Sequence, residues 1–342
     1  MQIIIDETNW DQRLDRFIRK YCKIYPEVKL GDIYSWIRKG NIKVNGKKTK
    51  EEYRVKQWDM IEFDQDDLWK KNPGALLSSK DRKIKKLGID EIQKMIIYKD
   101  SNRIVFDKPA WVVVHPSNKH WNDLCMNDYL ETYVNLKFEN LPVGSQVWNV
   151  KLDWVETFKP SFGYRLDKDT SGVLIAAKNY PALQYINEII RDRKIEKKYL
   201  AIVVWDFPKH LIIDKSLEKI YDKKFDRSHM VVDKSWLKAK TQCWNKKLIN
   251  HPDLWKISLL EVKIDTGRMH QIRIHLASSG YPVLGDIIYG NPAVNRKLYK
   301  NMNINRQMLH CWKYSFADIG NNNIKEFASE LPTDFKKLIE LY

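Results

Sequence analysis

Near its start the chain carries apolar residues at a helical period. Four residues follow the spacing i, i+3, i+4 and i+7: Leu14, Phe17, Ile18 and Tyr21. This spacing predicts an amphipathic helix. A second short helix is expected over residues 32–40, with Asp32 as its N-cap and Gly40 as its C-terminal stop. Both helices therefore precede the first strand signals.

An alternation of apolar and polar positions then predicts strands over residues 42–44 and 58–63, with Asn45-Gly46 as a hairpin turn. Five later segments have the apolar character of buried strands: 103–106, 111–114, 172–177, 199–205 and 255–264. The best later helix is 182–193, in which Leu183, Ile186 and Ile190 share one face.

Strands dominate this pattern, and helices occur at irregular intervals. We therefore expect a mixed α+β sheet rather than a doubly wound parallel one. A basic run over residues 80–86 and an Asn-Pro-Gly segment before it mark a linker. The predicted organisation is an N-terminal domain over residues 1–64, a basic flexible linker over 65–88, and a larger domain over 89–342.

Charge adds the first indication of a partner. The 342 residues include 60 Lys and Arg against 44 Asp and Glu, for a formal net charge of +16. Residues 12–63 alone contain 14 basic and 7 acidic side chains. Such a surface suits a polyanion, because binding phosphates releases condensed counterions, although a solvated Lys-rich surface needs no partner.

The chain contains no apolar run of the ~18 residues that a membrane helix needs, and its first residues do not resemble a secretory signal. The four cysteines have no metal-ligand spacing: Cys22, Cys125, Cys243 and Cys311. We expect reduced thiols in a cytoplasmic protein without membrane contact. Phosphate-binding glycine motifs and zinc motifs are absent, which predicts no cofactor and no metal.

Three segments carry residues suited to chemistry. In residues 163–172, Arg165, Asp167 and Asp169 lie in a turn that leads into a buried-looking strand, where function often sits. The same residues would also suit an ordinary turn that bonds its own backbone. Tyr199 begins an apolar strand after two lysines, a position typical of packing at the core edge as well as of a site.

The third segment, residues 265–275, holds Arg268, His270, Gln271 and Arg273. If it is helical, Met269, Ile272 and Leu276 would face the core, whereas His270, Gln271 and Arg273 would point elsewhere. Guanidinium groups and amides suit phosphates and base edges.

These segments together resemble the RluA family of pseudouridine synthases. Six motifs follow the family order: Asp107-Lys108-Pro109 to His115-Pro116, Arg165-Leu166-Asp167 to Ser171-Gly172, Lys198-Tyr199-Leu200-Ala201, Thr266-Gly267-Arg268 to His275, Gly285-Asp286 to Gly290, and Leu309-His310. The resemblance implies a catalytic domain with a largely antiparallel sheet. It also implies an enzyme that isomerises uridine in RNA without redox change or added energy.

The resemblance also implies residue roles. Asp167 is the essential carboxylate, Arg273 is the cation that keeps it ionised, and Tyr199 stacks on the target base or moves a proton. Arg165 would fill the space that the extruded base leaves. Four further residues are expected to bind substrate RNA or to line its pocket: Arg268, His270, Gln271 and Ile274. Whether Asp167 attacks the sugar or abstracts a proton stays open.

The N-terminal segment separately resembles an S4 RNA-binding domain. The resemblance rests on Arg13-Leu14-Asp15, Ile37 to Gly46 and Asp59-Met60-Ile61. Five residues there are expected to contact RNA: Arg13, Arg38, Lys39, Lys43 and Asn45. An S4 domain before this catalytic domain is the arrangement of family members that modify large-subunit ribosomal RNA, here expected to act as a monomer.

Three departures from the family pattern concern loop shape and substrate choice. Tyr164 stands where the family usually has His, Trp111 stands where it usually has Gly, and residues 130–161 form a longer stretch than usual. Other functions also remain open: the same chemistry on transfer RNA, a non-catalytic RNA-binding ribosome-assembly factor, or a glycosidase-like hydrolase. A hydrolase would need paired carboxylates, and we expect Asp169 to be structural, bonding the backbone of its loop.

Overall fold

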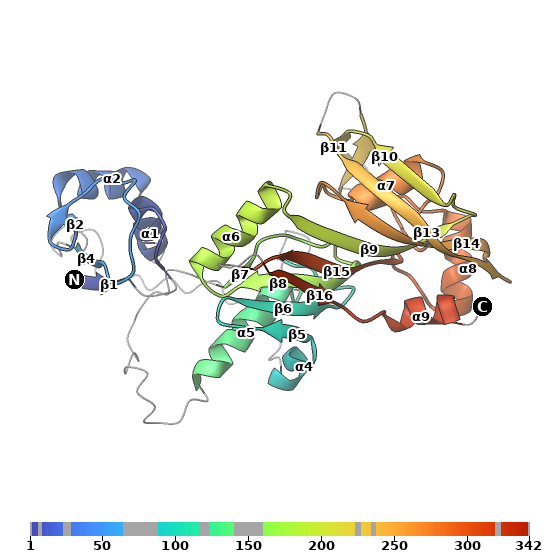
Figure 1. The fold of residues 1–342 in the computed structure, drawn as a ribbon, viewed down its shortest axis with the longest axis horizontal. Coiled ribbons are helices and arrows are strands. Elements are labelled where there is room, and N and C mark those ends of the chain that lie inside the picture. Colours follow the sequence, from blue (N-terminus) through green and yellow to red (C-terminus); the bar gives the residue numbers. More distant parts are fainter. Residues whose placement is uncertain are drawn as a thin grey trace.

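The computed structural model describes residues 2–5, 9–22, 29–63, 88–115, 123–139, 160–222, 227–233, 237–318 and 323–340. These residues form a four-stranded sheet, a ten-stranded sheet and a two-stranded ribbon (Figure 1). Among the helices within these ranges, none is both long enough and apolar enough to cross a membrane.

The N-terminal part is a small antiparallel sheet packed against two helices. The strands, in sheet order, are β1 (Gln2–Ile4), β4 (Met60–Phe63), β2 (Ile42–Val44) and β3 (Lys47–Lys48). The helices are α1 (Leu14–Tyr21) and α2 (Leu30–Lys39). Leu14, Phe17 and Ile18 are fully buried on α1, which confirms the predicted amphipathic face. This part has a hydrophobic core of its own.

The second helix ends as the sequence predicts but begins differently. Gly40 takes a left-handed conformation with φ 86° and stops the helix. Lys29, rather than Asp32, is the N-cap residue, and Asp32 accepts a hydrogen bond from the Lys29 amide at 2.9 Å. The helix therefore starts earlier, and the Asp32 carboxylate at its third position accepts from the N-cap amide behind it instead of capping the amides ahead of it.

The larger part is built on the ten-stranded sheet. Eight strands follow the order β10 (His210–Asp214), β13 (Lys240–His251), β14 (Trp255–Ile264), β9 (Ile195–Val204), β15 (Leu309–Ala317), β8 (Ser171–Ala177), β6 (Arg103–Lys108) and β5 (Ile96–Lys99). Two short strands join them, β16 (Ile324–Ala328) on β15 and β7 (Ser161–Phe162) on β8. Of the pairings between strands in the described residues, β8 with β15 is the parallel one. This arrangement confirms the predicted mixed, largely antiparallel sheet.

Helices lie along this sheet at irregular positions (Figure 1). They are α4 (Ile89–Lys94), α5 (Met126–Glu139), α6 (Tyr180–Arg191), α7 (Gln271–Ser278), α8 (Pro292–Met302) and α9 (Thr333–Glu340). Helix α6 packs on β8, and α7 packs on β13 and on the ribbon of β11 (Leu217–Asp222) and β12 (Arg227–Val232). The last contact brings the ribbon beside the start of α7.

The strand predicted over residues 111–114 is wrong. Strand β6 ends at Lys108, Pro109 has no amide hydrogen to donate, and Trp111 takes φ 74°. Val113 forms only an isolated bridge with Cys125. The chain therefore turns away from the sheet, and the Trp111 side chain is exposed.

Parts of the predicted organisation fall outside the described residues. Of the predicted linker 65–88, only Gly88 is described. Of the long stretch 130–161, residues 130–139 continue α5, residues 160–161 lie at the start of β7, and the rest lies outside. The division into two domains and a linker stays a prediction.

Candidate active site

Asp167 lies in the loop between β7 and β8, and a buried lysine fastens this loop to the sheet. Lys108, at the end of β6, has no exposed surface. Its Nζ donates to the carbonyls of Pro109, Lys168 and Thr170 at 2.8, 2.9 and 2.8 Å. Burial lowers the pKa of Lys108 to about 7, against the opposing charges of Asp169 and Asp167. The three bonds set the path of the backbone on both sides of Asp169.

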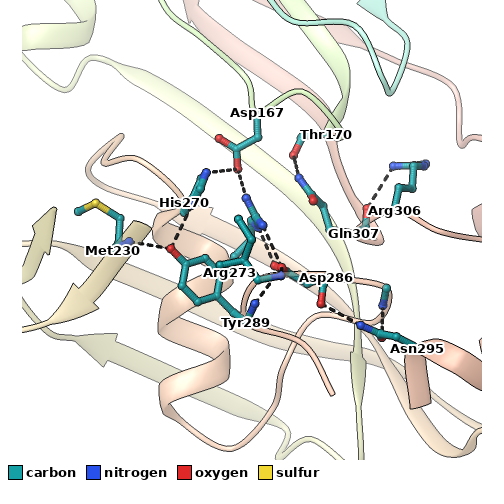
Figure 2. Close-up of polar contacts among 12 residues, drawn as sticks. Asp167, Thr170, Met230, His270, Arg273, Asp286, Tyr289, Asn295, Arg306 and Gln307 are labelled. Atoms are coloured by element: carbon teal, nitrogen blue, oxygen red, sulfur yellow. Dashed lines mark hydrogen bonds and ion pairs between the residues drawn. The ribbon is translucent and has the colours of Figure 1, made fainter. Parts of the chain in front are cut away.

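A second set of contacts reaches the loop from the chain before β15, and Figure 2 shows the one between Gln307 and Thr170. Arg306 donates to the carbonyl of Asp169 at 3.2 Å, and Gln307 donates to the Thr170 hydroxyl at 3.2 Å. Asp169 thus serves the loop through its backbone carbonyl. Its buried Oδ1 has no hydrogen-bond partner among the described residues, and burial raises the pKa of its carboxyl.

Gly172 allows β8 to approach β15 closely. Its φ is 115°, and a Cβ at this position would lie 2.1 Å from the carbonyl oxygen of Cys311. A residue with a side chain would force the two strands apart. The glycine therefore holds the loop end, and Asp167 with it, against the strand that follows Gln307.

Arg273, on the first turn of α7, is held by a second carboxylate. Asp286 binds Arg273 Nε at 2.6 Å and Nη2 at 2.9 Å, and both side chains are buried. The backbone amides of Ile288 and Tyr289 also donate to Asp286, at 2.8 and 3.0 Å. Burial acts to raise the pKa of Asp286, but the bonds and charge of Arg273 hold it below its usual value.

Because Asp286 binds Nε and Nη2, the third guanidinium nitrogen of Arg273 faces the loop that carries Asp167. Arg273 Nη1 donates to Asp167 Oδ2 at 3.0 Å, and His270 Nε2 lies 4.0 Å from the same oxygen (Figure 2). Asp167 Oδ1 accepts no hydrogen bond from the described residues, and 26% of the Asp167 side chain is exposed. The structure thus brings Asp167 and Arg273 together, as predicted, with one carboxylate oxygen left open.

We expected Gln271 and Arg273 to lie on a polar face of α7 that points away from the protein interior. Both side chains are buried instead. Gln271 is buried, accepts bonds from Thr266 and the Arg268 amide at 2.7 and 3.1 Å, and donates to Lys240 and Thr241. The expectation was wrong because satisfied hydrogen bonds offset the cost of burying polar groups. Gln271 therefore anchors the loop before α7.

Tyr199, on β9, is the third residue of the predicted catalytic set. It is 6% exposed and lies on the wall of the cavity that also contains Asp167 and Arg273. Burial raises the pKa of the Tyr199 phenol well above its ordinary value. The phenol therefore keeps its proton at neutral pH and offers a flat face to the cavity.

The cavity has a volume of about 740 Å³, within the range of small-molecule sites. Arg165 and Arg268 line it with exposed side chains, and His270 lines it from the start of α7. Ile274 is not part of its wall; it packs with Leu217, Met230 and Ala239 in a separate cluster. The pocket wall predicted from Ile274 is therefore formed by other residues of this segment.

Tyr164, the residue that stands where the family usually has His, has a packing role. Its hydroxyl donates to the Val173 carbonyl at 3.0 Å and accepts from the Ile175 amide at 3.2 Å. Its ring stacks on Tyr314 with a centroid distance of 4.9 Å, and the Lys197 ammonium lies over both rings. The substitution therefore leaves the loop attached to β8.

The five N-terminal residues predicted to contact RNA lie in the N-terminal part of the chain, and they differ in exposure and in side-chain bonding. Arg38, Lys39 and Lys43 are exposed. Arg13 forms an ion pair with Asp15 at 3.0 Å. Asn45 bonds Asp59 and the Met60 amide, both at 2.8 Å, so its side chain holds the hairpin.

Sequence reasoning assigned no role to Asp286, Tyr289 or Lys108, although all three belong to the quoted motifs, and none to Lys197, which directly precedes one. The spacing of Gly285-Asp286 to Gly290 was the available signal, but nothing local shows that its carboxylate meets Arg273. Among the described residues, no group of three or more His, Cys, Asp or Glu side chains is placed to hold a metal. The arrangement offers one positioned carboxylate, a cation, a phenol and a neutral imidazole.

Comparison with known proteins agrees with this site. The sequence profile described as RNA pseudouridylate synthase matches residues 102–278, which include Asp167, Tyr199 and Arg273. Ribosomal large subunit pseudouridine synthase D of Borreliella burgdorferi is 37% identical over 242 residues, 70% of this chain and 66% of that protein. Ribosomal large subunit pseudouridine synthase C of Buchnera aphidicola subsp. Acyrthosiphon pisum is 28% identical over 339 residues, 98% of this chain and 96% of that protein.

The fold agrees with a solved structure. Human RNA pseudouridylate synthase domain containing 1 superimposes with a TM-score of 0.54 at 21% identity, over 72% of this chain and 86% of that one. The similarity concerns the sheet and its helices, and at this identity it bears on the fold alone.

Proposed function

Because this chain belongs to the RNA pseudouridylate synthase family, we propose that it isomerises specific uridines of large-subunit ribosomal RNA. The chain is an RNA pseudouridine synthase, an isomerase. The observation that supports the ribosomal target is the alignment of nearly the whole chain, N-terminal sheet included, with a large-subunit synthase. The positive net charge of +16 suits this polyanionic substrate.

The reaction needs no added atoms or electrons. The bond from uracil N1 to ribose C1′ breaks, the base turns within the cavity, and C5 bonds to C1′. C5 loses its hydrogen as a proton, and N1 gains one. A carboxylate must act beside the sugar as the glycosidic bond opens. Asp167 is the group for this role, since it lines the cavity and keeps Oδ1 unoccupied by the described residues.

Arg273 holds the Asp167 carboxylate in place through the 3.0 Å bond to Oδ2. Tyr199 offers its ring to the detached uracil, an interaction worth ~1–3 kcal/mol by analogy with base–aromatic stacking. The exposed side chains of Arg165 and Arg268 would contact the phosphates and fill the gap that base extrusion leaves. The proposed catalytic set is therefore Asp167, Tyr199 and Arg273.

The N-terminal sheet domain gives the enzyme a second hold on RNA. Arg38, Lys39 and Lys43 present exposed cations on α2 and the strand that follows it. Such contacts add affinity without reading bases. This S4-like domain, the proposed residues 1–64, would thus place large structured RNA against the catalytic domain.

The test is to map pseudouridine after incubation of the purified enzyme with transcribed large-subunit ribosomal RNA, with carbodiimide labelling and primer-extension stops. Discrete stops are expected with the wild type and none with Asp167→Asn. Asp206→Asn is the matched control, because that exposed carboxylate pairs with Lys256 at 3.1 Å outside the cavity. Parallel arms contain ribosomal particles and transfer RNA. Stops confined to transfer RNA would overturn the proposed target, and binding without stops in any arm would overturn the activity.

A further inference from the structure

Two hydrogen bonds and one longer polar contact connect the β11–β12 ribbon to the catalytic carboxylate (Figure 2). The Met230 amide, on β12, donates to the Tyr289 hydroxyl at 2.7 Å. Tyr289 Oη lies 3.0 Å from His270 Nδ1, and His270 Nε2 faces Asp167 Oδ2 at 4.0 Å. The middle member of this series is the His270 imidazole, so the direction of its hydrogen bonds depends on which ring nitrogen carries the hydrogen.

The phenol decides this point. The Tyr289 oxygen already accepts the Met230 amide, and its own hydrogen has one acceptor among the described residues, His270 Nδ1. If Nδ1 carried a hydrogen, two donors would face each other, and the hydrogen of the part-buried phenol would be left without a partner among the described residues. Tyr289 therefore donates to Nδ1, and the hydrogen of a neutral His270 ring is on Nε2.

The carboxylate gives a second, independent reason. Nε2 is the ring nitrogen that faces Asp167 Oδ2. An unprotonated Nε2 would turn its lone pair toward a negative oxygen, whereas an N–H there attracts it. Both neighbours of the imidazole thus favour the same tautomer.

The neutral form is also the one favoured by the surroundings. Burial lowers the pKa of His270, and the nearby Arg273 acts in the same direction, while Asp167 and Asp286 oppose them. Burial raises the pKa of Tyr289 to about 12, so the phenol retains the hydrogen that it donates. His229 is the other titratable group acting on this ring, and it too lowers the pKa of His270.

We propose that Tyr289 is a positioning residue that fixes His270 as the Nε2–H tautomer, so that His270 and Arg273 both direct donors at Asp167 Oδ2. The remaining oxygen, Oδ1, is then the one presented to the uridine. This inference rests on the proposed role of Asp167 in uridine isomerisation. It gives His270 a task at the carboxylate rather than a general contact with RNA.

The first test reads the tautomer directly and needs no RNA. In protein labelled with ¹⁵N-histidine, two-bond ¹H–¹⁵N spectra distinguish a protonated from an unprotonated ring nitrogen, and the His270→Gln spectrum assigns the signal. We expect Nε2 protonated and Nδ1 unprotonated in the wild type. In Tyr289→Phe, which keeps the ring beside Arg273, a mixture of the two tautomers is expected. A wild-type ring protonated on Nδ1, or on both nitrogens at neutral pH, would overturn the proposal.

The second test measures single-turnover rates. Tyr289→Phe should lower the rate of isomerisation about tenfold with RNA affinity unchanged, because only the orientation of the carboxylate is lost. His270→Gln should lose less than His270→Asn, since a Gln amide reaches the position of Nε2 and an Asn amide does not. Tyr299→Phe, an exposed tyrosine on α8, is the matched control.

These outcomes separate this inference from the proposed function. Equal losses in His270→Gln and His270→Asn, or an unchanged rate in Tyr289→Phe, would overturn the positioning role while the activity stands. If the wild type modifies no RNA, the proposed function fails, and the spectra still decide whether Tyr289 sets the tautomer.

Discussion

Asp286 grips the guanidinium of Arg273 with both carboxylate oxygens, at 2.6 and 2.9 Å, and so turns the remaining nitrogen toward Asp167. The cation at the site is thus shared between a buried carboxylate that positions it and a partly exposed one that it serves. Single substitutions can separate these two functions.

Asp286→Asn should leave Arg273 buried with one anionic partner. We expect the free energy of unfolding to fall by about 3 kcal/mol, the usual cost of breaking a buried ion pair. The single-turnover rate should also fall by at least ~10-fold per folded molecule, since Arg273 loses its orientation. Urea titration and isomerisation assays measure the two effects.

Asp318→Asn is the control for that substitution, because it weakens another pair with a buried arginine, Arg103 with the partly exposed Asp318, outside the cavity. It should lower stability and leave the rate per folded molecule unchanged. An Asp286→Asn protein with wild-type activity would show that the grip does not position Arg273.

Arg165→Ala should impair the enzyme more on structured RNA than on a short single strand. Extruding a base costs a few kcal/mol, and an exposed arginine at the cavity can offset part of this cost by filling the gap. We expect about a tenfold larger loss of kcat/KM on the structured substrate. Arg191→Ala, which removes another exposed arginine of the cavity lining, is the control. Equal losses on both RNAs would contradict the proposed insertion.

The paired change Arg38→Ala and Lys39→Ala should weaken RNA binding at every sequence. Because each phosphate contact releases a counterion, the slope of log affinity against log salt should flatten by up to ~2. Filter binding at several salt concentrations measures it. Lys297→Ala with Lys300→Ala, two exposed lysines on α8, provides a charge-matched comparison. The same slope in both double variants would place the N-terminal cations outside the RNA interface.

Stability should fall on acidification through His310. Burial and the charge of Arg306 lower the pKa of this imidazole to about 4, against an ordinary value of about 6.5. Between these two values the unfolded chain therefore binds more protons than the folded protein. The contribution of His310 to stability is fully present above pH 6.5 and is lost as pH falls toward 4. The share of His310 is about 3 kcal/mol when fully developed.

Denaturant unfolding at a series of pH values tests this. His310→Gln should flatten the dependence of unfolding free energy on pH, while the exposed His210→Gln should not. Other histidines with lowered pKa values contribute their own shares: His115, His251, His270 and His275. An unchanged slope in His310→Gln would contradict the assignment.

Several features could be predicted because they depend on neighbours along the chain. The buried face of α1 follows from the spacing of Leu14, Phe17 and Ile18, and the end of α2 follows from Gly40. The strands around β8 and β14 follow from their apolar runs. The predicted start of α2 was wrong because Lys29, not Asp32, is its N-cap residue. The predicted strand over residues 111–114 was wrong because the chain turns at Trp111.

The sequence by itself determined the mixed sheet, the family resemblance and the residues proposed for catalysis, because regular spacing and short motifs are written in contiguous residues. Only the tertiary structure decided that Asp167 and Arg273, 106 positions apart, would meet at 3.0 Å, and that Asp286 would hold the Arg273 guanidinium in that position. It also decided that Gln271 is buried and that Tyr289 faces His270. Such contacts depend on how distant strands pair and which polar groups find partners on burial, and no local pattern carries that information.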